Sequence, residues 1–157
     1  DCVLLIFKHK KGDFMTSEEI LQEAREWIGC RWEHQASLKG VACDCVGLIR
    51  GVHEQLTGDS FQGDYDYPAT WHLFKQEEKL YIECKKYMNE IPISDIQPGD
   101  VLLFAFRPKF PAHHLAFLTD DETLIHSYMD VGKVVETSYN DEWKKMGRFA
   151  FRFKEVE

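Results

Sequence analysis

The sequence has no long hydrophobic run. Its longest apolar stretch near the start covers residues 3–7, whereas a helix that spans a bilayer needs about 20 such residues. The same region lacks the basic leader and the small-residue cleavage site of a signal peptide. We therefore expect no membrane span and no signal peptide, so any export must use another route.

Basic residues are in the minority. The chain has 19 Lys and Arg against 27 Asp and Glu, which gives a formal net charge of −8. Its basic groups, such as residues 8–11 and 144–145, are short, whereas binding to a phosphate backbone needs a continuous basic surface. We therefore expect no nucleic-acid partner.

Cysteines are few and odd in number, which argues against a disulfide framework. There are five in 157 residues, and a chain that is 44% hydrophobic can build a core without cross-links. Cys30 and Cys84 are expected to be small buried side chains. Cys43 lies two residues before Cys45, where it is either a bystander or an oxidation partner. A zinc-stabilised binding module is a further alternative, but Cys-x-Cys lacks the two-to-four-residue gap of zinc fingers.

Cys45 is the candidate nucleophile. Apolar residues follow it at offsets of 3, 4, 7 and 11, which predicts an amphipathic helix whose first turn carries the thiol. The unpaired N–H groups and positive dipole end of a helix start favour the thiolate, and the same N–H groups can hold an oxyanion. Gly47 and Gly51 lie four residues apart on this helix and would let another backbone approach closely.

Two histidines follow on predicted strands. His114 and His126 are separated by 12 residues across a tight hairpin, so both side chains can lie on one face of a sheet. His114 would exchange the proton of Cys45, and His126 would orient its imidazole. His113 is expected to be structural and to lie on the opposite face.

The rest of the chain divides into helices followed by strands, which indicates an α+β domain. Residues 15–157 are expected to form one domain, after an extension at 1–14 that is either non-native or an arm toward a partner. A capping box of Thr16 and Glu19 opens a helix that Gly29 ends, with Ile28 on its apolar face. A loop is expected at 57–68 and a helix at 69–89. The predicted strands are 100–106, 114–119, 122–127, 133–137 and 148–153, in an antiparallel sheet.

Several segments resemble the NlpC-type cysteine peptidases of the cell wall, a papain-like group. Residues 44–48 (Asp-Cys-Val-Gly-Leu) resemble the nucleophile motif of the family, and residues 98–104 resemble its Pro-Gly-Asp strand entry. Residues 114–118 and 124–126 resemble the strands of the catalytic histidine and its orienting residue. The similarity runs from about residue 18 to 153, and residues 34–40 resemble the branch encoded by phages and gene transfer agents.

This resemblance implies an NlpC-type fold in which N-terminal helices, including the nucleophile helix, pack on a C-terminal antiparallel, barrel-like sheet. It implies catalytic roles for Cys45, His114 and His126, with no metal and no cofactor. Asp44 would bind the free amine of a stem peptide, cap the helix, or do both. Val46 stands where the family has serine, and Trp32 stands nearest to a family tyrosine, so both are candidate substrate contacts.

The implied substrate is the stem peptide of peptidoglycan, cleaved between D-glutamate and diaminopimelate or lysine through a thioester. The protein would be made in the bacterial cytoplasm and delivered to the cell wall as a virion or tail component, with phage tail-tip proteins as partners. Three alternatives on the same scaffold are an amidase that cuts the sugar–peptide link, an acyltransferase that acts on a lipid, and an inactive structural tail protein.

Overall fold

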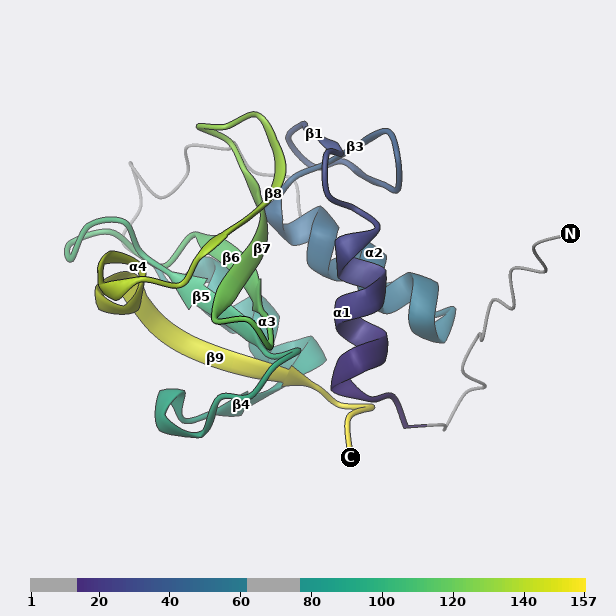
Figure 1. Cartoon of the computed structure of the whole chain (residues 1–157). Helices are drawn as coiled ribbons and strands as arrows, with labels where there is room; N and C mark the ends of the chain where they lie inside the picture. The colour runs from purple at the N-terminus through teal and green to yellow at the C-terminus, as the bar shows by residue number, and fades with distance from the viewer. Residues whose placement is uncertain (1–13, 62–76) are drawn as a thin grey trace, which may run out of the picture.

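Helices and one sheet make up the computed structural model, which describes residues 14–61 and 77–157 (Figure 1). The helices are α1 (Ser17–Arg25), α2 (Cys45–Thr57), α3 (Lys79–Tyr87) and α4 (Asp141–Met146), with a 3-10 turn η2 (Ile93–Asp95). The strands are β1 (Arg31–Trp32), β2 (Ser37–Leu38), β3 (Ala42–Cys43), β4 (Met88–Ile91), β5 (Val101–Phe104), β6 (His114–Leu118), β7 (Thr123–Tyr128), β8 (Lys133–Ser138) and β9 (Gly147–Phe153).

Helix α1 begins where its capping residue predicts. The hydroxyl of Thr16 accepts a hydrogen bond from the backbone N–H of Glu19, and three apolar side chains of the helix are buried. The helix ends at Arg25 rather than near Gly29, because residues 26–29 form a turn. The prediction for Ile28 is wrong, since it is 45% exposed, whereas Trp27 turns inward and is buried.

Within the described residues the strands form one sheet in the order β2-β3-β1-β8-β7-β6-β5-β9-β4. Every pairing from β8 to β4 is antiparallel, and only the short β1 and β3 pair in parallel. The predicted α+β class is therefore confirmed. The five predicted strands are present, with ends that differ by at most two residues.

The predicted helix at 69–89 is too long at its C-terminal end. Residues 88–91 pair with β9 as β4, because the helical stripe of apolar residues ends at Met88, whose side chain joins the main core. Residues 69–76 lie outside the described part of the chain, as do residues 1–13 of the proposed N-terminal extension and 62–68 of the proposed loop. Helix α4 was not predicted.

Two apolar clusters lie on opposite faces of the sheet. The larger lies between the sheet and helices α1 to α3, and includes Leu115, Phe117 and Ile125 from β6 and β7. The smaller contains Ala116 and Leu124 from the alternate positions of the same strands, and Trp143 of α4 packs against it. The sheet is thus covered on both faces, as its uniformly buried central strands require.

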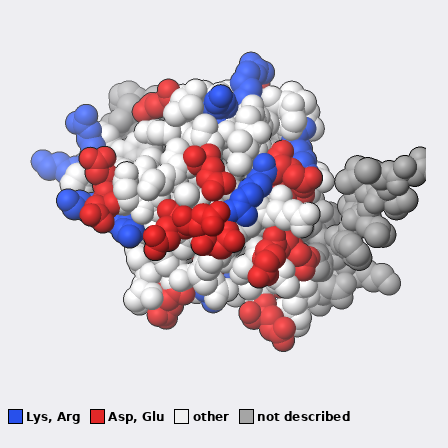
Figure 2. All heavy atoms as spheres, viewed as in Figure 1, with Lys and Arg blue, Asp and Glu red and all other residues white. Residues whose placement is uncertain are grey.

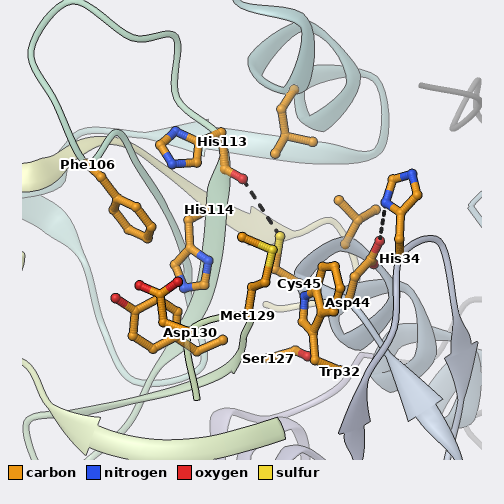
Figure 3. Close-up of a pocket in the computed structure, with 13 residues that line it drawn as sticks. Trp32, His34, Asp44, Cys45, Phe106, His113, His114, Ser127, Met129 and Asp130 are labelled. Atoms are coloured by element: carbon orange, nitrogen blue, oxygen red, sulfur yellow. Dashed lines mark hydrogen bonds and ion pairs between the residues drawn. The ribbon is translucent and has the colours of Figure 1, made fainter. Parts of the chain in front are cut away.

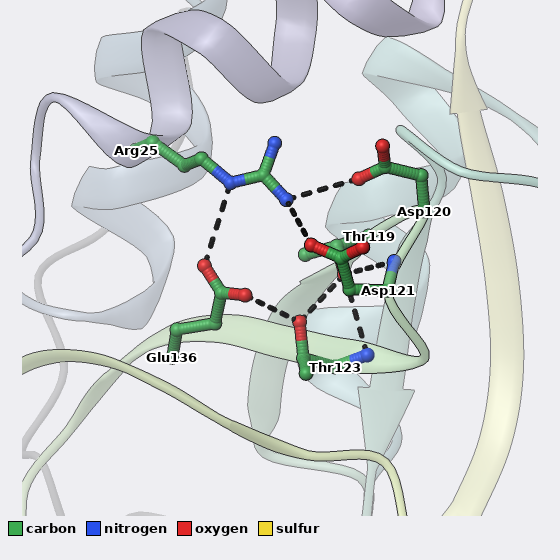
Figure 4. A network of polar contacts seen from close by, with 6 residues as sticks. All are labelled: Arg25, Thr119, Asp120, Asp121, Thr123 and Glu136. Carbon is green, nitrogen blue, oxygen red and sulfur yellow. Dashed lines mark hydrogen bonds and ion pairs between the residues drawn. The ribbon is translucent and has the colours of Figure 1, made fainter.

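Polar contacts tie α1 to the β7–β8 side of the sheet. Arg25 contacts Asp120 at 2.9 Å, Asp121 at 3.4 Å and Glu136 at 3.4 Å, and Glu136 also accepts a hydrogen bond from Thr123 (Figure 4). On the face shown in Figure 2, acidic side chains gather in several groups with basic ones between them. Among the described residues, no helix has the length and apolar composition to cross a bilayer.

Candidate active site

A cavity of about 160 Å³ opens where α2 begins, β6 begins and β7 ends. Its lining brings together candidate residues from distant parts of the sequence, namely Trp32, Asp44, Cys45, Val46 and His114 (Figure 3). The rest of the lining comes from residues 127–130, from His113 and Phe106 in the segment before β6, and from His34 and Leu80. Five of the six candidate site residues therefore meet on one cavity.

Cys45 is the first residue of α2, as its sequence pattern predicts. Asp44 is the N-cap residue, and its carboxylate accepts hydrogen bonds from the backbone N–H groups of Gly47 at 2.7 Å and Gln35 at 2.6 Å. The expected capping role of Asp44 is thus confirmed. A Cβ atom at Gly47 would collide with the backbone oxygen of Ala36, so the close backbone approach expected at this glycine is present.

The thiol of Cys45 is neutral in this environment. Burial, reinforced by the negative charge of Asp44, raises its pKa to about 12, although nearby backbone N–H groups, including that of Leu115, oppose the shift. The backbone N–H groups at the helix start thus act in the expected direction and lower the pKa, but burial raises it by more. The thiol donates a hydrogen bond to the carbonyl oxygen of His113 at 3.8 Å.

The two imidazoles lie on the same face of the sheet, as their spacing predicts. His114 Nε2 and His126 Nδ1 are 2.7 Å apart, and His126 Nε2 lies 2.9 Å from the hydroxyl of Thr137 on β8. With Nε2 engaged in this way, Nδ1 is the remaining ring nitrogen of His114. Burial lowers the pKa of His126 to about 4, and burial beside His126 holds the pKa of His114 well below its ordinary value.

Aromatic side chains enclose this pair. Trp143 lies 5.7 Å from the ring of His114 and 5.1 Å from that of His126, and Tyr128 stacks on His126 at 5.2 Å. Phe106 lies 5.3 Å from His114 on the side of the cavity. The enclosure removes water from both imidazoles, which explains why both are neutral and why their mutual hydrogen bond is favoured.

The family of the chain follows from comparison with known proteins. Residues 29–152 match the NlpC/P60 family. The chain belongs to this family. Tail tip assembly protein K of Escherichia phage lambda is 29% identical over 128 residues, which are 80% of this chain and 58% of that protein. The chain thus spans little more than half the length of that relative.

Solved structures of the NlpC/P60 family share the fold. The NlpC/p60 domain of the peptidoglycan hydrolase SagA superposes with a TM-score of 0.63 at 21% identity, covering 88% of this chain and 100% of that one. A family protein from Bacillus cereus gives 0.64 at 16%, covering 89% and 41%. RipD from Mycobacterium tuberculosis, described as non-catalytic and adapted to peptidoglycan binding, gives 0.55 at 11%, covering 87% and 95%. Family membership therefore does not by itself establish hydrolysis.

His113 was expected to be structural and to lie on the opposite face of the sheet from His114, and the structure differs from this in part. Its ring lies against Phe106 with Nδ1 3.1 Å from the carbonyl oxygen of Pro111, and it lines the same cavity as Cys45. Its contact with the thiol is made through the backbone rather than the imidazole. The alternation of β6 then directs His114, and not His113, toward His126.

Thr137 and Trp143 contact the imidazole pair and were not predicted from the sequence. The hydroxyl of Thr137 contacts His126 Nε2. No local sequence pattern predicts this contact, because it depends on the register between β7 and β8. Trp143 belongs to α4, which does carry a signal. Asn140 caps this helix and two acidic residues follow in its first turn, an arrangement typical of a helix start.

Cys43 and Cys30 are buried, as is Cys84. Burial raises the pKa of the Cys43 thiol, and the side chains of Cys30 and Ser127 are its polar neighbours. Ser127 donates a hydrogen bond to the carbonyl oxygen of Cys43 at 2.7 Å. Among the described residues, no three His, Cys, Asp or Glu side chains are grouped as a metal ion requires, so the zinc-binding alternative has no ligand set there.

Proposed function

We propose that this NlpC/P60 chain is a cell-wall cysteine peptidase that cleaves the stem peptide of peptidoglycan. The observation that carries the proposal is one cavity shared by a thiol at a helix start and an imidazole that a second imidazole holds from behind. This is the arrangement of a nucleophile, a base and an orienting group. The peptidoglycan hydrolase SagA, which shares the fold, supports the choice of substrate.

The mechanism begins with a neutral pair. For His114 Nδ1 to act as a base, His114 Nε2–H must donate to His126 Nδ1 and His126 Nε2–H must donate to the hydroxyl of Thr137, which the two measured distances permit. The sulfur of Cys45 then attacks the amide carbonyl carbon while its proton passes to His114 Nδ1. Backbone N–H groups at the start of α2 stabilise the resulting oxyanion.

Collapse of the tetrahedral intermediate breaks the amide bond. The imidazolium of His114 gives its proton to the departing amine, which leaves an acyl group on Cys45 as a thioester. His114 next takes a proton from water, and the hydroxide attacks the thioester carbon. The C–S bond then breaks, the carboxylic acid leaves, and the imidazolium returns its proton to the sulfur of Cys45. Each proton transfer passes through His114, and both the thiol and the neutral imidazole are restored at the end of the cycle.

Substrate orientation is assigned to the residues beside the nucleophile. Asp44 accepts two backbone hydrogen bonds, and a carboxylate has about four acceptor positions, so it can also receive a free amine of the substrate. Trp32 and Val46 line the same cavity and would contact the peptide without supplying a hydroxyl. The bond assigned is that between D-glutamate and diaminopimelate or lysine.

Delivery is proposed to occur through a phage tail. The support is the similarity to tail tip assembly protein K of phage lambda. The chain would be made in the bacterial cytoplasm, assemble with tail-tip proteins and reach the cell wall with the virion.

Mass spectrometry of fragments released from purified peptidoglycan sacculi tests the proposal. Wild-type protein under reducing conditions is compared with the Cys45→Ala variant, and we expect stem-peptide fragments that are absent with the variant. Fragments whose masses show cleavage of the sugar–peptide link would identify an amidase instead. If sacculi bind the wild-type protein but neither protein releases fragments, the chain is a binding protein of the kind described for RipD.

A further inference from the structure

The segment between β5 and β6 forms one wall of the active-site cavity through Phe106 and His113. It also leads directly into His114, the first residue of β6. The carbonyl oxygen of His113 accepts the hydrogen bond of the Cys45 thiol. Any displacement of this segment therefore moves both the His113 carbonyl that contacts the thiol and the backbone of His114, whose imidazole must take the proton of the thiol.

Glu78 holds the end of this segment. It is the N-cap residue of α3, yet its side chain makes no capping hydrogen bond to that helix. Its carboxylate instead accepts the backbone N–H of Ala112 at 3.0 Å, two residues before His114. The Glu78 carboxylate could accept a hydrogen bond from an unpaired backbone N–H at the start of α3. It instead accepts one from Ala112, which is fully buried in another segment.

Arg148 holds the beginning of the same segment. This residue lies on β9, and its Nη1 contacts the carboxylate of Glu78 at 3.1 Å. Its Nη2 donates to the carbonyl oxygens of Arg107, at 3.2 Å, and Pro108. One guanidinium thus connects the first part of the segment to the carboxylate that holds its last part, and both side chains are half-buried.

We infer that Glu78 and Arg148 are positioning residues, which set the distance between the Cys45 thiol and the His114 imidazole by holding residues 107–112. The inference rests on the proposed peptidase activity. Neither side chain lines the cavity, so neither touches the reacting atoms. Their effect therefore reaches the reacting atoms only through this segment, and we expect it mainly in the rate of the chemical step. A displacement of about 1 Å in reacting groups can lower a rate about 100-fold, so a small shift is sufficient.

The test compares Glu78→Ala with a matched variant elsewhere. Glu136→Ala removes another half-buried carboxylate that contacts an arginine, in the network that ties α1 to the sheet away from the cavity (Figure 4). Both variants should lose thermal stability. Hydrolysis of a synthetic stem peptide gives kcat and KM, and hydrogen exchange of the peptide spanning residues 105–114 reports whether the segment is held.

With Glu78→Ala we expect kcat to fall at least about tenfold, with KM changed less than about threefold and with faster exchange in residues 105–114. Glu136→Ala should change neither kcat nor that exchange. Glu78→Gln keeps an oxygen that can accept the N–H of Ala112, so it should recover most of the lost rate.

Provided that wild-type protein cleaves the peptide, two results would overturn the inference. One is an unchanged kcat in Glu78→Ala, whether or not exchange becomes faster. The other is an equal fall of kcat in Glu136→Ala, since the effect would then follow from lost stability. If wild-type protein does not cleave the stem peptide, the proposed function itself fails, and the inference fails with it.

Discussion

Replacement of His126 separates an orienting role from a purely structural one. The ring nitrogen Nδ1 of His126 lies 2.7 Å from His114 Nε2, and both side chains are buried. His126→Ala removes this acceptor, so the Nε2–H of His114 is left buried without a partner unless the ring rotates or changes tautomer. An unsatisfied buried donor costs about 1–3 kcal/mol.

That cost applies to the tautomer of His114 that acts as the base, in which Nδ1 accepts the proton and Nε2 carries one. If the whole of it raises the barrier to proton transfer from Cys45, kcat falls about 5- to 150-fold, because each 1.36 kcal/mol corresponds to about tenfold in rate. His126→Gln places an amide oxygen where it can accept the same N–H, so its kcat should stay within about fivefold of wild type.

The assay is the hydrolysis of a synthetic stem peptide, followed by chromatography of both products. Thermal unfolding of each variant is measured in parallel, because the alanine variant also leaves a void beside Trp143 and Tyr128. Equal losses in the two variants, at equal stability, would refute the orienting role. Full activity of His126→Ala would refute it more directly.

Three further predictions concern the thiol, the imidazole and the packing of α2. The Cys45 thiol of the free protein should resist alkylation by iodoacetamide up to about pH 10, since burial raises its pKa to about 12; alkylation at pH 8 at the rate of an ordinary free cysteine would contradict this. Because burial lowers the pKa of His126 from 6.5 to about 4, only the unfolded chain gains its proton between these pH values, so about 3 kcal/mol of stability present above pH 6.5 should be lost by pH 4. Urea unfolding of His126→Gln should show a correspondingly weaker dependence on pH. Gly51→Ala should lower the unfolding free energy by about 2 kcal/mol or more, because its Cβ would overlap the buried ring of Trp27; unchanged thermal unfolding would show that the ring can move.

Periodicity in the sequence was sufficient to predict the helix and the two strands that carry the proposed nucleophile, base and orienting residue. The apolar spacing after Cys45 predicts α2, and the even separation of His114 and His126 predicts their common face. Both patterns are local, and the structure retains them because one face of each element must be buried. The cap at Asp44 was likewise predictable, since aspartate before an apolar helix has a direct use for its carboxylate.

The parts that the sequence did not predict depend on contacts between distant segments. Strands β1, β2 and β3 have two residues each, which is too short for any alternation to appear. The contact between His126 and Thr137 exists only once β7 and β8 pair in register. The pKa of the Cys45 thiol depends on how far the side chain is shielded from water, and segments distant from the helix start, such as the one that contains His113, provide that shielding.

A neutral Cys45 and a neutral His114 have a consequence for how the site is activated. The thiolate is the form that attacks carbonyls and also the form that oxidants attack, so a thiol held neutral by burial is poor at both reactions. Proton transfer to His114 creates an ion pair in the same desolvated space, and its charges need partners. The backbone N–H groups at the start of α2 lower the pKa of the thiol, and in the proposed mechanism they are such partners for the sulfur and then for the oxyanion. In the proposed mechanism, reactivity therefore arises mainly when a bound substrate converts the thiol into a tetrahedral adduct, and the thiol of the free protein stays protonated.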